Sequence, residues 1–296
     1  MKYQTTLKNL LGFLFLVFTW SSASSQEQEA PLVRVHYEFY HINDTLNPDK
    51  PHEEEMVLYL GRQNTLYGSY ASQRMMQQVL NQVNDPGFDG NLTIRSNGKN
   101  RPQSYYIHLP TQYIQQIYQH LNQHYLLEEM YPEIAWTILP DLKNLAGYSV
   151  QKANGHFAGR EYTAWFTTEL PFQGAPWKLQ GLPGLVLEAE TKDGEVKFSF
   201  AGLETDIQEK ALIGIPENAI PTTPQLLQRL LNAYQKNPQA AMSAAASSRQ
   251  SNVITFSDGS DPLSSIDPSK IKSININTNS AGTSAVTNNP LEKVNP

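Results

Sequence analysis

The sequence contains no cysteine among its 296 residues. This absence excludes disulfide bonds, thiolate metal sites, iron–sulfur clusters, cysteine nucleophiles and lipid attachment to an N-terminal cysteine. Basic residues are also few, with 22 lysines and arginines against 28 aspartates and glutamates, so the formal net charge is −6. A chain with this balance has no diffuse attraction for phosphate backbones, and nucleic acid is not an expected partner.

Signatures of common enzyme classes are missing as well. The sequence has no His-Glu-x-x-His, no Gly-x-Ser-x-Gly, no Gly-x-Gly-x-x-Gly after a strand and no Gly-Lys-Ser phosphate loop. These absences favour a non-catalytic protein, and the sequence assigns no catalytic residue, metal or cofactor.

The first 25 residues have the pattern of a secretory signal peptide. Lys2 and Lys8 give a positive start without an acidic residue, residues 10–18 are an apolar run, and residues 21–25 are small. The run is shorter than the about 20 apolar residues that a spanning helix needs, so we expect cleavage after Ser25. The alternative is an uncleaved N-terminal anchor. No later stretch approaches spanning length, so we expect an exported protein, periplasmic or extracellular, without a transmembrane segment after cleavage.

Strand patterns dominate the remaining chain. Residues 72–83 have the apolar spacing of a helix, whereas residues 111–130 fit either a helix or two strands, and their strand-like flanks favour strands. Lys192-Asp193-Gly194 is a hairpin signal, because Asp-Gly supplies the positive φ angles of a tight turn. Strands are expected at residues 32–42, 56–60, 65–70, 92–95, 104–109, 134–139, 146–153, 160–168, 185–191 and 195–203.

Composition changes near Gly214 and again near residue 257. Thr223 and Pro224 suit the cap and first position of a helix, and the apolar residues that follow share one face that we expect to pack on the sheet. The last 40 residues are rich in serine, asparagine and threonine. We therefore expect a signal peptide (1–25), a β-rich domain (26–210), a helical segment packed on the sheet (211–256) and a disordered tail (257–296).

One aromatic set is a candidate binding surface. Arg160, Tyr162 and Trp165 lie in one expected strand, and Trp177 follows it. Aromatic rings beside an arginine can stack on sugars or peptides. The alternative is that the tryptophans fill the core and Arg160 pairs with an acidic residue.

Two further sets are candidates for a hydrolase. His120 and His124 would share one face of a helix and could bind a metal ion, with Glu128 extending that face. Glu128/Glu129 and Glu188/Glu190 could instead supply the two carboxylates of a glycosidase-like hydrolase. The hydrolase hypothesis requires Glu188 or Glu128 to converge with His120, His124 or His156 in one cleft. The alternative is that the histidines lie on the surface and that the carboxylates are salt-bridged or solvated on strand faces.

The hexapeptide Gly181-Leu182-Pro183-Gly184-Leu185-Val186 is the most distinctive segment. Gly181 and Gly184 allow backbone angles that other residues avoid, and Pro183 fixes φ between them. The pattern predicts a sharp turn that delivers an apolar strand into the sheet, which is an architectural role. The alternative is that the glycine-rich loop presents backbone amides to a ligand.

Residues 143–188 resemble the GLPGLI family, which is named for this hexapeptide. The surrounding matches are Gly147-Tyr148, Gln151-Lys152-Ala153, Phe157-Ala158-Gly159-Arg160, Ala164-Trp165-Phe166 and Leu170-Pro171. Val186 replaces the final isoleucine, Ala175-Pro176 stands where Gly-Pro is usual, and Val150 stands where many members have cysteine. The resemblance implies an exported protein of Gram-negative bacteria with no assigned activity. It also implies an antiparallel sheet that curves into a bowl or half-barrel.

These observations predict a mainly β (β-rich α+β) fold with a C-terminal helical segment packed on the sheet. The expected function is that of a non-catalytic envelope protein that binds a peptide, glycan, lipid or outer-membrane partner, for example a receptor. The alternatives are a carboxylate- or metal-dependent hydrolase, and a structural or assembly factor that acts through its tail.

Overall fold

Twelve strands form one large sheet in the computed structural model. The structure describes residues 28–96, 101–120, 123–207, 211–237, 239, 255–256, 268–278 and 287–293. The expected signal peptide lies outside these residues. The strands are β1 (Val33–His41), β2 (His52–Leu60), β3 (Asn64–Ser69), β4 (Asn91–Ser96), β5 (Gln103–His108), β6 (Tyr113–His120), β7 (Gln123–Glu129), β8 (Thr137–Leu145), β9 (Tyr148–Phe157), β10 (Arg160–Thr167), β11 (Leu185–Thr191), β12 (Val196–Glu204), β13 (Ala211–Leu212), β14 (Ile220–Pro221), β15 (Thr255–Phe256) and β16 (Ser273–Thr278). The helices are α1 (Ala71–Val83), α2 (Pro224–Lys236) and a 3₁₀ turn (Pro268–Lys270).

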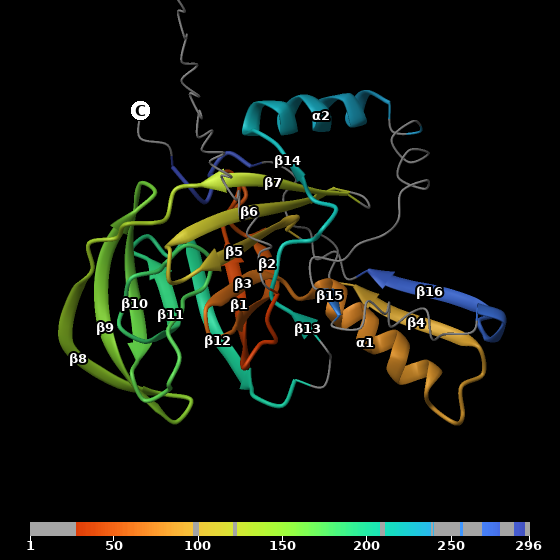
Figure 1. Ribbon diagram of the computed structural model, residues 1–296, viewed down its shortest axis with the longest axis horizontal. Coiled ribbons are helices and arrows are strands. Elements are labelled where there is room, and N and C mark those ends of the chain that lie inside the picture. The colour runs from red at the N-terminus through yellow and green to blue at the C-terminus, as the bar shows by residue number, and fades with distance from the viewer. Residues whose placement is uncertain are drawn as a thin grey trace, which may run out of the picture.

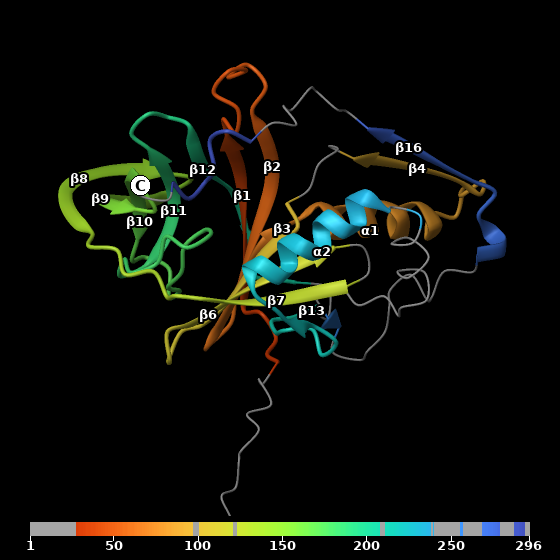
Figure 2. The same cartoon turned by 90° about the horizontal axis from the view of Figure 1, so that it is seen from above.

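The sheet has the order β14-β7-β6-β5-β3-β2-β1-β12-β11-β10-β9-β8 and does not close into a barrel. Its pairs are antiparallel except for β14, which runs parallel to β7. Strands β8 to β12 curl around one side of the molecule (Figures 1 and 2). The predicted mainly β fold with a curved sheet is confirmed, and residues 111–130 form two strands.

The largest core lies on one face of the sheet, which we call the inner face. It is built from alternate residues of β1, β2 and β9 to β12, for example Val35, Phe39 and Phe198. The connection between β10 and β11 adds Trp177, Leu179 and Leu182, all buried. The half-barrel is therefore filled by its own chain, and its inner face is not an open bowl.

Helices α1 and α2 pack on different parts of the structure. In α2, Thr223 Oγ1 accepts a hydrogen bond from the backbone N–H of Leu226 (3.3 Å), which confirms the predicted cap. Leu227 packs on Tyr125 and Leu127 of β7, so α2 covers this part of the sheet. The predicted helical segment (211–256) also contains the short strands β13, β14 and β15. Helix α1 packs on β4, which pairs with β16 away from the main sheet (Figure 1).

Three tight turns differ in detail from the sequence prediction. At the β11–β12 hairpin only Gly194 has a positive φ (+71°), so the turn does not use two positive angles. Asp193 instead accepts from the backbone N–H of Glu195 (3.1 Å). Ala146 and Gly147 form the β8–β9 turn with φ of +51° and +93°, so β9 begins two residues later than predicted. Ala158 and Gly159 make the next turn in the same way.

The tail prediction falls largely outside the described residues, but two of its segments are described. Residues 273–278 form β16, in register with β4. Residues 287–293, which we call the C-terminal segment, lie against the β-rich domain, with Asn289 buried. These two segments depart from the expectation of a disordered tail. No helix in the part of the chain that the structure describes is long and apolar enough to cross a membrane.

Candidate functional site

The four residues of the predicted aromatic surface do not form one surface. Arg160, Tyr162 and Trp177 are buried, with exposed fractions of 3%, 2% and 1%. Trp165 lies on the opposite face of β10, because side chains alternate along a strand. The prediction of a joint stacking surface is therefore wrong, and the alternative of core tryptophans with a paired arginine holds for Trp177 and Arg160.

Trp165 lies in a charged setting on the outer face. The Nζ atom of Lys143 is 4.4 Å from its ring centroid, and that of Lys152 is 5.9 Å away. Lys143 also forms an ion pair with Glu188. The Glu188 carboxylate is thus engaged on the outer face, away from the histidines of the hydrolase hypothesis.

Each glycine of the hexapeptide has its own structural role. Gly181 has a φ of +107°, as predicted, whereas Gly184 has no positive φ. A Cβ atom on Gly184 would lie 2.1 Å from the carbonyl oxygen of Thr167, so this position requires close backbone approach. Leu182, Leu185 and Val186 are buried and Pro183 is exposed. The backbone N–H of Gly174 bonds to Gly184 O, and that of Val186 bonds to Gly174 O, so the motif fastens the loop to β11.

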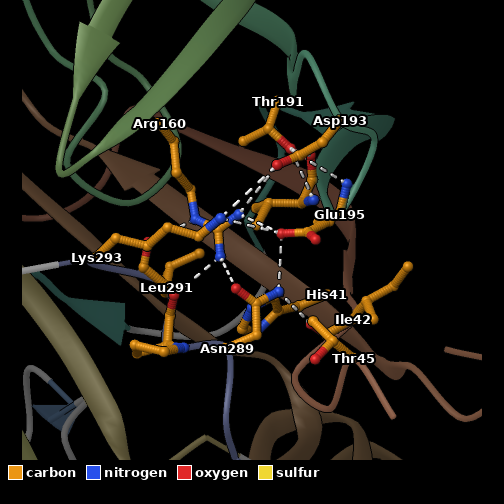
Figure 3. Close-up of polar contacts among 12 residues, drawn as sticks. His41, Ile42, Thr45, Arg160, Thr191, Asp193, Glu195, Asn289, Leu291 and Lys293 are labelled. Atoms are coloured by element: carbon orange, nitrogen blue, oxygen red, sulfur yellow. Dashed lines mark hydrogen bonds and ion pairs between the residues drawn. The ribbon is translucent and has the colours of Figure 1, made fainter. Parts of the chain in front are cut away.

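Arg160 is the centre of a polar network that holds the C-terminal segment (Figure 3). Its guanidinium donates to Asn289 Oδ1 (2.7 Å), to Pro290 O (2.9 Å) and to Leu291 O (3.1 Å). It also donates to Glu195 Oε2 (2.8 Å). Charge-assisted hydrogen bonds of this kind are among the stronger ones in proteins.

Residues on both sides of Asn289 are held as well. Asn288 Nδ2 donates to Asp44 Oδ1 (2.7 Å), and its Oδ1 accepts from the backbone N–H of Thr45 (2.9 Å). The Nζ atom of Lys178, itself 3% exposed, contacts Glu292 Oε1 (2.6 Å). We define the docking site as the residues of the domain that make these contacts, together with the backbone that receives the segment: Ile42, Asn43, Asp44, Thr45, Ala158, Arg160, Lys178, Asp193 and Glu195.

Two carboxylates of the docking site, Glu195 and Asp193, have a pKa below the ordinary value. Burial acts to raise the pKa of Glu195, but hydrogen bonds from Arg160 and Asn289 outweigh it and lower the pKa below its ordinary value. For Asp193, burial is likewise outweighed, first by the hydrogen bond from Thr191, and its pKa is also lowered. Lys293 approaches Glu195 to 3.4 Å, so opposite charges face each other across the contact.

The structure separates the residues of the hydrolase hypotheses. His120 stacks on Tyr234 of α2 (4.8 Å between ring centroids), whereas His124 is fully buried and belongs to the opposite face of the sheet. His156 bonds to Glu161 on the β9–β10 hairpin. Among the residues that the structure describes, no group of three or more histidine, aspartate or glutamate side chains could hold a metal ion. These particular side chains therefore do not form a site.

Sequence reasoning identified Arg160 but missed its partners. Glu195 follows a hairpin turn and Asn289 lies 129 residues beyond Arg160, in a segment with the composition of a disordered tail. The local signal was weak: Pro290, Leu291 and Glu292 interrupt an otherwise small and polar stretch.

Comparison with known proteins gives a distant likeness of fold. No family model matches the chain, and no curated protein matches it. A solved structure of PNGF-II in space group P21 aligns with a TM-score of 0.45 and 13% identity over 68% of this chain. PNGF-II in space group C2 aligns with a TM-score of 0.43 and 13% identity over 67% of this chain. The chain spans 33% and 32% of those two chains. At this similarity the likeness carries no information about ligand or activity.

Proposed function

We propose that the protein is an exported, non-catalytic envelope protein that binds a short peptide segment of a partner at the docking site. The observation that carries the proposal is that the docking site holds a peptide segment of this kind, the protein's own residues 287–293, through both side chains and backbone. The N-terminal pattern supports export. The resemblance of residues 143–188 to the GLPGLI family supports an envelope location, with an outer-membrane receptor or another envelope component as the partner.

The contact is mainly polar, which favours exchange of the segment. The backbone N–H groups of Asn288 and Asn289 both donate to Asn43 O (3.1 Å each), and that of Lys293 donates to Ala158 O (2.8 Å). Within the described segment, Leu291 is the side chain that packs against the inner-face core. Hydrogen bonds contribute about 1 kcal/mol each in net terms, so a segment held this way can be displaced by a competing one.

The side-chain amide of Asn289 is the recognition element. Its oxygen accepts from Arg160, and its nitrogen donates to Ile42 O (2.7 Å) and Glu195 Oε2 (2.9 Å). In an aspartate at position 289, a carboxylate oxygen would replace the amide nitrogen and face the two acceptors, Ile42 O and Glu195 Oε2. Two acceptors facing each other without a proton are unfavourable in a buried position. The site therefore selects asparagine.

The test is binding of a fluorescent peptide with the sequence of residues 285–296 to the full chain. In the wild type the protein's own segment competes, so we expect weak binding. In the Asn289→Asp variant the protein's own segment binds the docking site more weakly, so we expect the added peptide to bind at least about tenfold tighter than to the wild type. Thr287→Asp is the matched control, because it adds the same charge at an exposed position of the segment.

Two results would refute the proposal. The first is equal peptide binding by the wild type, Asn289→Asp and Thr287→Asp. The second is undiminished binding of a peptide that carries aspartate in place of the residue 289 asparagine. Glu292→Lys, which removes the Lys178 contact at an exposed position, is a second variant that vacates the site.

A further inference from the structure

Beside the docking site, the inner face holds two buried hydrogen-bond donors that have no acceptor among the described residues. The Tyr67 side chain is 3% exposed, and no described residue is a hydrogen-bond partner of its hydroxyl. The Nε atom of Arg101 is buried and likewise has no partner in the described part of the chain. Well over nine in ten buried polar groups in native proteins are hydrogen-bonded, so two orphan donors call for an explanation.

Ring contacts place the Tyr67 ring and the Arg101 guanidinium around one aromatic pair. The guanidinium of Arg101 lies over the ring of Phe39, 4.6 Å from its centroid. Phe39 packs on Phe198 (5.1 Å), and Phe198 packs on Tyr67 (6.4 Å). Another guanidinium nitrogen, Nη2, is 3.1 Å from His41 Nδ1, which must accept because arginine is only a donor.

Protonation keeps Tyr67 a donor. Burial raises the pKa of its phenol well above the ordinary value, so the hydroxyl retains its proton at neutral pH. The protonated Tyr67 hydroxyl and the Arg101 guanidinium are both donors, so both can donate to one shared acceptor. The described residues supply no such acceptor.

The guanidinium of Arg101 also lacks a carboxylate in contact. Glu54 is the nearby acid, but its two oxygens accept from the backbone N–H of Arg101 (3.1 Å each), and Oε2 also contacts His52 Nε2 (2.8 Å). Within the described ranges, no ion pair involves the Arg101 guanidinium. Arg101 is half-buried with its Nε atom buried, and a guanidinium that loses this much water without binding an anion is costly, so an anionic acceptor is favoured over water.

We propose that Arg101 Nε–H and the Tyr67 hydroxyl bind the carboxylate of a small organic acid, with Phe39 and Phe198 as the apolar wall. A carboxylate has two acceptor oxygens and a single charge, and it is the geometric partner of a guanidinium. A phosphate dianion would cost more to desolvate in this buried setting. The site uses no residue of the C-terminal segment.

The test is urea denaturation of the full chain in sodium acetate against sodium chloride at equal ionic strength. Acetate bound only by the folded protein raises the folded-to-unfolded ratio about tenfold at ten times its dissociation constant. Tyr67→Phe removes one donor without changing the ring, so we expect its acetate response to be lost and its stability in chloride to be kept. Tyr106→Phe is the matched control, because the Tyr106 hydroxyl donates to Asn64 Oδ1 (2.6 Å) in a different core.

In the control we expect lower stability but an unchanged acetate response. Absence of an acetate effect in the wild type, or an equal effect in Tyr67→Phe, overturns the proposal and assigns the donors to ordered water. The experiment uses neither the peptide nor any variant of the C-terminal segment. Its failure is therefore distinguishable from failure of the proposed peptide binding.

Discussion

Replacement of Gly184 by alanine tests the architectural role of the hexapeptide. The added Cβ atom would lie 2.1 Å from Thr167 O and 2.9 Å from Thr167 C, both backbone atoms of β10. Backbone cannot rotate away as a side chain can, so β10 and β11 would have to separate by roughly 1 Å at this point. Overpacking of a core costs about 1–3 kcal/mol, and a backbone clash belongs at the upper end, so we expect a loss of about 3 kcal/mol.

Two other glycines provide controls for the same substitution. Gly147 has a φ of +93° and no atom within 4 Å of a Cβ, so Gly147→Ala isolates the cost of the backbone angle. That cost is about 1–2 kcal/mol. At Gly181 the nearest contact is 3.4 Å, from a Trp136 side chain, so Gly181→Ala should cost about the same.

The measurement is the free energy of unfolding from urea titration, with far-ultraviolet circular dichroism to check that the sheet is retained. We expect Gly184→Ala to be the most destabilised of the three, although Gly184 alone has an ordinary φ. If Gly184→Ala unfolds at the same urea concentration as Gly147→Ala, the close-approach argument is refuted.

Three other predictions concern the sheet, its titration and its helix. Tyr37→Phe should lower stability by about 1 kcal/mol, because it removes the hydrogen bond that the buried hydroxyl donates to Val186 O (2.6 Å); urea titration measures the loss. Burial lowers the pKa of His41 to about 3 and that of His124 to about 4, so both are neutral in the folded state and bind protons on unfolding. The free energy of unfolding should therefore fall as the pH drops from about 6.5 toward 4, by about 1.4 kcal/mol per pH unit for each histidine. The check is a His124→Leu variant, in which the free energy of unfolding should fall less steeply with pH. Thr223→Ala removes the cap of α2 and should cost about 1 kcal/mol, measured by hydrogen exchange of the helix; unchanged exchange would contradict the capping role.

Local patterns identified most elements of the fold. The alternation of residues 32–42 and the Thr223-Pro224 start of α2 were sufficient, since a two-residue period and a cap are properties of neighbouring residues. Residues 111–130 were ambiguous because the spacing of their apolar residues fits both a helix and strands. They form strands because β6 pairs with β5 on one side and with β7 on the other. The predicted aromatic binding surface was wrong because the sequence of β10 shows that side chains alternate between two faces, but it does not show which of the two faces is buried in the core.

The sequence by itself determined that this chain is strand-rich, lacks cysteine chemistry and carries a glycine-proline turn before an apolar strand. These properties depend on composition and on residues within a few positions of one another. Only the tertiary structure decided that Arg160 is buried against Asn289 and that Tyr67 lies near Arg101, where no described residue supplies an acceptor. Such contacts join residues tens to more than a hundred positions apart, and they form because the curved sheet brings distant strands to one inner face. No periodicity in the chain encodes that approach.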